Sequence, residues 1–223
     1  MKSKSINVMA LIRLYCLKAD ARRKAVTDRA GGGGPSPYRH ALKALDDHLH
    51  GGRSREEAQT ALEALKDEAL SEASIDIFLR ALHFLEPFKG KAIDPLEGSF
   101  WSPDSVFQIK ARSHIAIETE KEIISVQFWN NKTADFFSLP AQIASSLYKD
   151  AIPSDLLKPI RYVFHNLRTG KTYEFESVTR ESRRARRELI FEIERLMTKA
   201  TRVRLPEVSD DRTSEEPKRA TRH

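Results

Sequence analysis

The stretch VFQIKARSHIAIETEKEIISVQFW, residues 106–129, decides the fold class of this sequence. Apolar and polar residues alternate over much of it, and β-branched and aromatic residues are frequent, which is typical of β-strands. We predict strands at residues 106–111, 114–117 and 123–129, the last two joined by the charged turn 118–122. A mainly antiparallel sheet therefore begins in this region.

The residues after this stretch predict a second hairpin and two helices. Proline is tolerated in the first turn of a helix, so Leu139-Pro140 begins a short helix that continues to Tyr148. Two further strands are expected at residues 160–167 and 172–178, because the turn between them contains a glycine available for positive φ. A long helix with apolar residues at helical spacing follows over residues 179–199.

The residues before this stretch carry a helical pattern instead. Apolar positions recur at helical spacing in four segments, residues 1–17, 36–50, 54–70 and 74–86. Ser54 and Glu57 have the spacing of a capping box, which marks the start of the third helix. The chain is thus predicted to be an α+β protein, in which a helical N-terminal part precedes a sheet packed by a short helix and a long C-terminal helix.

These patterns suggest a division into three parts. We expect a helical domain over residues 1–90, with a glycine-rich linker at 31–37, and an α+β domain over residues 91–205, made of two hairpin units and the C-terminal helix. Residues 206–223 contain too few apolar side chains to offset their own ordering entropy, so we predict a disordered tail.

Composition and charge limit the class of protein. The 223 residues are 40% hydrophobic, 31% charged and 8% aromatic, which is typical of a soluble globular chain, and no apolar stretch predicts a membrane span. Cys16 is the only cysteine, so no disulfide within the chain and no cysteine-built metal site is expected, and we predict a cytoplasmic protein. The first 30 residues carry eight basic and two acidic side chains, which leaves a mitochondrial presequence as the alternative.

Four arginines in the early turns of the last helix form the strongest electrostatic feature. The N-terminal end of a helix carries partial positive charge, so basic side chains there favour a nearby anion or acidic group. A guanidinium is suited to bidentate contact with carboxylate or phosphate. We therefore identify Arg183, Arg184, Arg186 and Arg187 as a candidate binding surface, and the alternative is a solvated face in which Arg184 pairs with Glu188.

A second pattern is similar in part to the PD-(D/E)xK motif of metal-dependent nucleases. In such enzymes carboxylates hold a divalent metal ion and a lysine steadies the attacking water. Here Pro103-Asp104 precedes Gln108 and Lys110, and Lys132 follows a later strand. The separation of Asp104 from Gln108 is short and glutamine is a poorer ligand than a carboxylate, so the resemblance implies at most a degenerate nuclease-like domain.

Other polar clusters have simpler interpretations. Asp46, Asp47, His48 and His50 are expected to form a polar helix end, because two ligands do not make a metal site. His165 is expected among cross-strand charges, and the aromatic residues of the strand region are expected in the core. No Walker, dinucleotide-binding or nucleophile-elbow motif occurs in the sequence, so no cofactor and no metal is predicted.

The resulting hypothesis is a non-catalytic binding or adaptor protein that contacts an acidic partner, protein or nucleic acid, through the arginine-rich helix. The net charge of +6 is compatible with such a partner. The excess of positive charge lies at the two ends of the chain, and the balanced middle argues against a protein wholly devoted to binding phosphate. The competing hypothesis is a divalent-metal-dependent hydrolase that uses Asp104, Gln108, Lys110 and Lys132.

Overall fold

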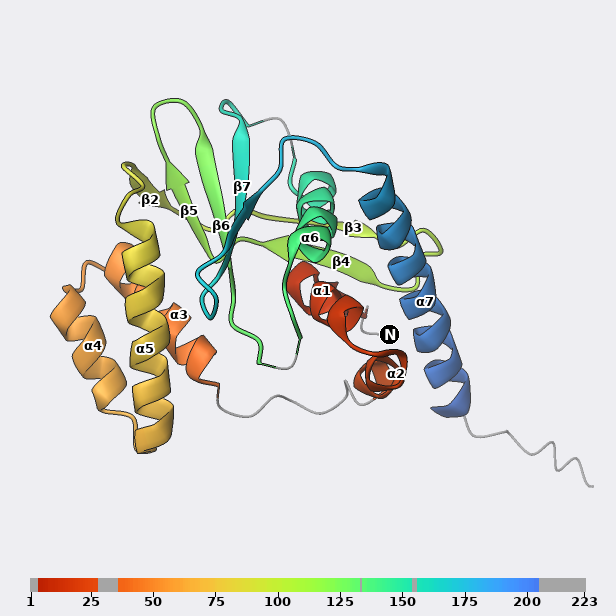
Figure 1. Cartoon of the computed structure of the whole chain (residues 1–223), viewed down its shortest axis with the longest axis horizontal. Coiled ribbons are helices and arrows are strands. Elements are labelled where there is room, and N and C mark those ends of the chain that lie inside the picture. Colours follow the sequence, from red (N-terminus) through yellow and green to blue (C-terminus); the bar gives the residue numbers. More distant parts are fainter. Residues whose placement is uncertain (1–3, 28–35, 133, 154–155, 205–223) are drawn as a thin grey trace, which may run out of the picture.

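A computed structural model describes residues 4–27, 36–132, 134–153 and 156–204 of the chain (Figure 1). The helices within these residues are α1 (Val8–Cys16), α2 (Ala19–Thr27), α3 (Pro37–Leu49), α4 (Arg55–Glu63), α5 (Glu68–Leu85), α6 (Ser138–Ala151) and α7 (Arg180–Arg204). The strands are β1 (Ser5–Asn7), β2 (Lys91–Ile93), β3 (Glu97–Trp101), β4 (Gln108–Arg112), β5 (Ile115–Glu118), β6 (Ile123–Trp129), β7 (Ile160–Asn166) and β8 (Thr172–Glu174). The predicted α+β class is confirmed.

The strands form two mixed sheets. The larger sheet has the order β2-β5-β6-β7-β8, and β6 runs parallel to β7 while the other neighbours are antiparallel. The smaller sheet has the order β1-β4-β3, in which β1 is parallel to β4 and β3 is antiparallel to it. The helix α6 lies between β6 and β7 in the chain, as a parallel connection requires.

The larger sheet is covered on both faces. Every residue of β6 is buried, and side chains of a strand alternate between the two faces of its sheet. Ile124, Val126 and Phe128 belong to the hydrophobic core formed with α3, α4 and α5, while Trp129 belongs to the core formed with α1, α6 and α7. Figure 1 shows these two groups of helices on opposite sides of the larger sheet.

The N-terminal residues belong to the second of these cores. The sequence predicts a helix from residue 1 to 17, whereas the structure has β1 paired with β4 before α1 begins. Asn7 starts α1, because its side-chain oxygen accepts a hydrogen bond from the Met9 N–H at 2.9 Å. Ile6 and Leu11 are buried in the same core as α6 and α7. The residues before 90 are thus divided between two cores, each of which also contains residues from beyond 90.

Arg22 of α2 joins three helices of this core. Its guanidinium donates hydrogen bonds to the carbonyls of Leu14, Tyr15 and Leu17 at the end of α1, at 2.8–3.1 Å, and forms an ion pair with Glu192 of α7. The last carbonyls of a helix have no partner within the helix, so this arginine satisfies groups that α1 leaves open. The N-terminal helices are therefore fastened to the C-terminal helix.

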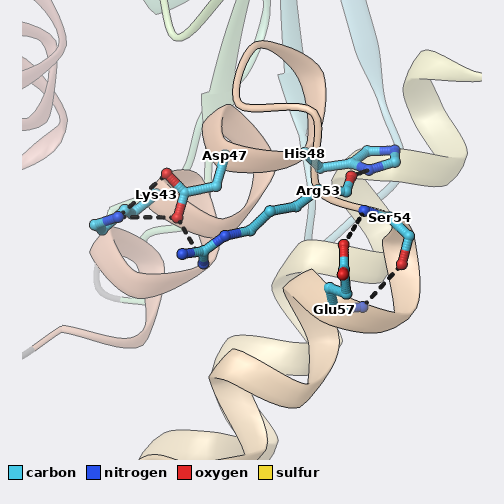
Figure 2. A network of polar contacts seen from close by, with 6 residues as sticks. All are labelled: Lys43, Asp47, His48, Arg53, Ser54 and Glu57. Carbon is cyan, nitrogen blue, oxygen red and sulfur yellow. Dashed lines mark hydrogen bonds and ion pairs between the residues drawn. The ribbon is translucent and has the colours of Figure 1, made fainter.

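The capping box predicted at the start of α4 is confirmed (Figure 2). The Ser54 side chain accepts a hydrogen bond from the Glu57 N–H at 3.1 Å, and the Glu57 carboxylate accepts one from the Ser54 N–H at 2.8 Å. At the end of α3, Asp47 forms ion pairs with Lys43 and Arg53. These contacts set the turn between α3 and α4.

The predicted elements differ from the structure in several further places, and α2 is among the helices that the sequence did not predict. The sequence predicts one helix from residue 54 to 70, but α4 ends at Glu63 and α5 begins anew, because the Asp67 carboxylate accepts a hydrogen bond from the Leu70 N–H at 2.9 Å. Strands β2 and β3 are not predicted, since β2 has only three residues and β3 contains Gly98 and no β-branched residue. The final strand, β8, ends at Glu174, four residues earlier than expected.

Two predicted segments lie outside the described residues. They are most of the glycine-rich linker at 31–37 and the whole tail at 206–223. In the part of the chain that the structure describes, no helix combines the length and the apolar character needed to span a membrane.

Candidate functional site

The arginines predicted as a binding surface lie on two different faces of α7. Arg183, Arg186 and Arg187 line a groove between α7 and the β3–β4 hairpin. Arg184 points elsewhere and forms an ion pair with Glu188 at 2.7 Å, as the solvated-face interpretation predicts for this one residue. The spacing of residues 183, 186 and 187 is compatible with one helical face, and the way α7 packs turns this face toward the groove and Arg184 away from it.

Arg186 lines the groove from α7. Its guanidinium makes an ion pair with Asp150 of α6, a hydrogen bond to the Ser146 side chain, and a cation–π contact with Phe100 at 5.6 Å from the ring centroid. Its side chain is 19% exposed. Arg186 is therefore committed to holding α6, α7 and β3 together, and contributes to the groove mainly as a fixed positive charge.

The opposite wall is the turn of the β3–β4 hairpin, and a local hydrogen-bond network fixes its shape. The Ser102 hydroxyl accepts hydrogen bonds from the N–H groups of Val106 and Phe107, both at 3.2 Å. Ser105 has a positive φ of 53° and its N–H donates to the Ser102 carbonyl at 2.8 Å. These contacts place Pro103 and Asp104 at the mouth of the groove.

A buried carboxylate fastens this turn to α7. Glu194 is 4% exposed, and its Oε1 accepts a hydrogen bond from the Asp104 N–H at 2.9 Å. The contact links residues 90 positions apart in the chain. Because it joins the hairpin turn to α7, it fixes the distance between the two walls of the groove near Glu194. A buried carboxylate needs such a donor, since burying an unpaired charge is costly.

The groove is mostly apolar between these charged ends. Its volume is about 660 Å³, and its walls include Phe100, Trp101, Ile190 and Phe191. Ile190 is buried at 4% exposure, whereas Trp101 is 49% exposed and Phe191 is 64% exposed. Two large aromatic side chains of the groove are therefore exposed to solvent, while the aliphatic one is buried.

Charge is distributed unevenly along the groove. Among the described residues, the Arg187 guanidinium has no hydrogen-bond or ion-pair partner, and that of Arg183 donates only to the Val178 carbonyl at 3.1 Å. Neither arginine is paired with an acidic group. Glu194 and Asp104 lie at the other end, about 17 Å away along α7 at 1.5 Å per residue. The groove thus has a positive end and a negative end.

The residues of the hydrolase hypothesis do not come together. Asp104 lies at the mouth of the groove, but Gln108 and Lys110 lie on β4 beside β1 and β3, where the Gln108 amide donates to the Ser99 hydroxyl at 2.8 Å. Lys132 is exposed in the loop after β6, and β6 belongs to the larger sheet whereas β4 belongs to the smaller one. Over the described ranges, no group of three or more histidine, cysteine, aspartate or glutamate side chains is arranged to hold a metal ion.

The histidine and acid clusters have structural partners. His50 bonds to the Asp46 carboxylate at 2.9 Å and to the Ile93 carbonyl at 3.0 Å, and so links α3 to β2. On the larger sheet, Arg161 forms ion pairs with Glu122 and Glu174 at 3.0 and 3.2 Å. His165, which was expected among cross-strand charges, is instead 8% exposed and bonds to the neutral Thr172 hydroxyl. These contacts occupy the side chains that a metal or an acid–base reaction would need.

A second cavity, of about 600 Å³, lies between the end of α5 and the β7–β8 hairpin and was not predicted. Its walls include Arg80, Arg168 and His165. The His165 ring stacks on Phe84 with centroids 3.9 Å apart, and burial lowers the pKa of His165 to about 4. Its Nδ1 is within 2.9 Å of the Thr172 hydroxyl. No sequence spacing relates α5 to this hairpin, so only the packing reveals the cavity.

Comparisons with known proteins add little to this geometry. No protein-family model matches the chain, and no curated protein matches it. A solved structure described as "Crystal structure of SSO0001" is similar at 13% sequence identity, with 92% of this chain and 79% of that chain covered and a TM-score of 0.36. A likeness of this size carries no argument about fold or activity.

Proposed function

We propose that this chain is a non-catalytic binding or adaptor protein that contacts an acidic partner, protein or nucleic acid, through the groove between α7 and the β3–β4 hairpin. One observation carries the proposal. The same groove is lined by two arginines that have no acidic partner, Arg183 and Arg187, and by the exposed aromatic side chains of Trp101 and Phe191. Interfaces concentrate their binding energy in aromatic and arginine side chains of this kind.

The composition of the groove favours binding over catalysis. The described residues that line it include no histidine, cysteine, serine or lysine, so the usual nucleophiles and general bases other than carboxylates are missing there. Of its two carboxylates, that of Glu194 is buried against the Asp104 N–H. We further propose the cytoplasm as the compartment, because the single cysteine, Cys16, forms no disulfide within the chain.

A charge-matched pair of variants tests this proposal. The double variant Arg183→Gln, Arg187→Gln removes two positive charges from the groove, and Arg184→Gln, Arg195→Gln removes two from the exposed side of the same helix. Binding to a single-stranded oligonucleotide, an RNA, a DNA duplex and poly-L-glutamate is measured by fluorescence anisotropy at about 50 mM and about 200 mM salt. Each lost charge-assisted contact weakens binding by roughly tenfold.

We expect at least one of these acidic probes to bind at low salt, and to bind more weakly to the groove variant than to the control variant. Absence of binding both to all four probes and to acidic peptides selected against the chain, or equal losses in both variants, would overturn the proposal. Incubation of the oligonucleotides with magnesium or manganese tests the competing hydrolase hypothesis. Cleavage that disappears in Asp104→Ala would show that the protein is an enzyme after all.

A further inference from the structure

We infer that the groove binds a short segment of a partner protein, in which one large apolar side chain is flanked on one side by acidic residues. This inference rests on the proposed function and names the class of partner. It is carried by the size of the groove, by its exposed aromatic side chains and by the uneven placement of its charges.

The size of the groove suits a peptide segment. Its residues on α7 run from Arg183 to Glu194, a length of about 17 Å at 1.5 Å per residue. An extended chain covers this distance with about five residues, at roughly 3.3 Å per residue, and a helix covers it with about three turns. A volume of about 660 Å³ leaves room for one or two large side chains of the incoming segment.

The apolar part of the groove requires an apolar anchor. Among the apolar residues that line it, Ile190 is buried and Phe100 is half-buried, whereas the rings of Trp101 and Phe191 are exposed. An aromatic or long aliphatic side chain inserted between these rings would remove apolar surface from water on all sides. The gain is about 25 cal/mol for each Å² of apolar area buried.

The charges determine the polarity of the bound segment. Arg187 precedes Phe191 by one turn of α7, about 6 Å, and Arg183 lies one further turn away. An acidic residue within about two extended residues, or one helical turn, of the anchor therefore meets these guanidiniums. At the opposite end, Glu194 and Asp104 exclude acidic residues and favour neutral or basic ones.

The same charges disfavour a nucleic acid. A nucleic-acid strand carries a phosphate at every nucleotide, so a strand along the groove would bring phosphates against Asp104 and Glu194. Only two groove arginines, Arg183 and Arg187, are not already paired with an acidic group, while Arg186 is paired with Asp150. Two phosphate contacts give a salt slope of only about 1.4 on a single strand, which is typical of weak binding.

The test begins with a random peptide library displayed on phage and selected against the full chain. We expect the enriched peptides to share a large apolar residue with aspartate or glutamate on one side of it. A synthetic peptide of the consensus sequence is then titrated. Trp101 is 49% exposed and Trp129 is 4% exposed, so binding should change the tryptophan emission of the wild type and leave that of Trp101→Phe unchanged.

Matched variants locate the bound peptide. Phe191→Ala and Arg187→Gln should each lower the affinity of the consensus peptide by about tenfold or more, since each removes a predicted anchor contact. Phe137→Ala removes a phenylalanine that is 50% exposed and lies outside the groove, and Arg184→Gln removes an arginine of α7 outside the groove. Both should leave the affinity unchanged.

The possible failures separate the two proposals. Enriched peptides without acidic residues, or affinities that do not change in the groove variants, would overturn the peptide inference. Groove-dependent binding of an oligonucleotide without such a peptide consensus would also overturn it, while leaving the proposed acidic partner in place. If neither peptides nor acidic probes bind in a groove-dependent manner, both proposals fail.

Discussion

At the scale of single residues, His114 is a polar side chain of the interior that is held in its neutral form and takes part in backbone hydrogen bonding. Its Nδ1 accepts a hydrogen bond from the Phe128 N–H at 2.9 Å, and the ring of Tyr38 lies edge-on at 5.6 Å between centroids. The Tyr38 hydroxyl donates to the Phe128 carbonyl at 2.7 Å. Burial, and to a smaller extent the nearby Arg112, lowers the pKa of His114 to about 4. The imidazole is therefore neutral in the folded protein at pH 7.

This environment predicts a loss of stability in mild acid. The ordinary pKa of histidine is 6.5, so the unfolded chain binds a proton between pH 6.5 and about 4 that the folded chain does not bind. The free energy of unfolding should fall as the pH is lowered through this window, by about 2 kcal/mol at pH 5 from His114 alone. His165, whose pKa is also lowered to about 4, changes stability in the same direction.

Urea unfolding at pH 7 and pH 5 measures this effect. His114→Asn keeps an acceptor for the Phe128 N–H and removes the titrating group, so it should reduce the difference in free energy between the two pH values by about 2 kcal/mol. His83→Asn is the control, because the His83 side chain is 86% exposed. An unchanged pH dependence in His114→Asn would contradict the prediction.

At the scale of elements, local signals determine where most helices begin. Ser54 with Glu57 starts α4, and Asp67 starts α5, each through a side chain that accepts a backbone N–H hydrogen bond. The predicted helix of residues 54–70 overlooked Asp67, although an aspartate followed by a good helix former is a cap signal that the sequence contains. Capping can thus be recognised from residue types alone when the whole helix is searched for it.

The capping box of α4 predicts the effect of one substitution. Ser54→Ala leaves the Glu57 N–H without its acceptor and should lower the free energy of unfolding by about 1 kcal/mol. Ser54→Asp retains an acceptor and should restore most of this loss. Thr60→Ala, at an exposed position in the middle of α4, should cause no loss. Urea unfolding at pH 7 compares the three variants, and equal stability of Ser54→Ala and wild type would disprove a role for the cap.

Helical spacing alone did not separate the arginines of α7 by function. The sequence identifies Arg183, Arg184, Arg186 and Arg187 as one cluster, but the face of a helix that meets a groove depends on how that helix packs. The inward positions of Leu189 and Ile193 set the rotation of α7 on the core. With that rotation fixed, Arg184 must face solvent beside Glu188.

At the scale of the whole molecule, the N-terminal segment completes the core of the C-terminal region. Five apolar side chains of β1 and α1 are at most 4% exposed: Ile6, Val8, Leu11, Leu14 and Ile12. Burying such a side chain contributes about 1.5–3 kcal/mol, so together they contribute of the order of 10 kcal/mol. The net stability of a domain is only about 5–15 kcal/mol.

The sequence predicts a domain boundary at residue 90, whereas the cores shared across that position predict that the two parts do not fold alone, and a fragment decides between these predictions. We expect residues 91–223, expressed alone, to show no cooperative thermal unfolding by circular dichroism, because the fragment lacks β1 and α1. Residues 4–204 serve as the control, since they retain every described element, and should unfold as cooperatively as the full chain. A cooperative transition in the 91–223 fragment would instead support an independent α+β domain.

The sequence by itself determined the α+β class, the position of β6, the capping box at Ser54 and the basic character of α7. Each of these depends on residues that lie close together in the chain, so periodicity and residue type suffice. The parallel pairing of β1 with β4 and the contact of Glu194 with Asp104 were decided only by the tertiary structure. Such contacts join residues about 90 or more positions apart, and their partners are selected by how the helices and sheets pack against one another.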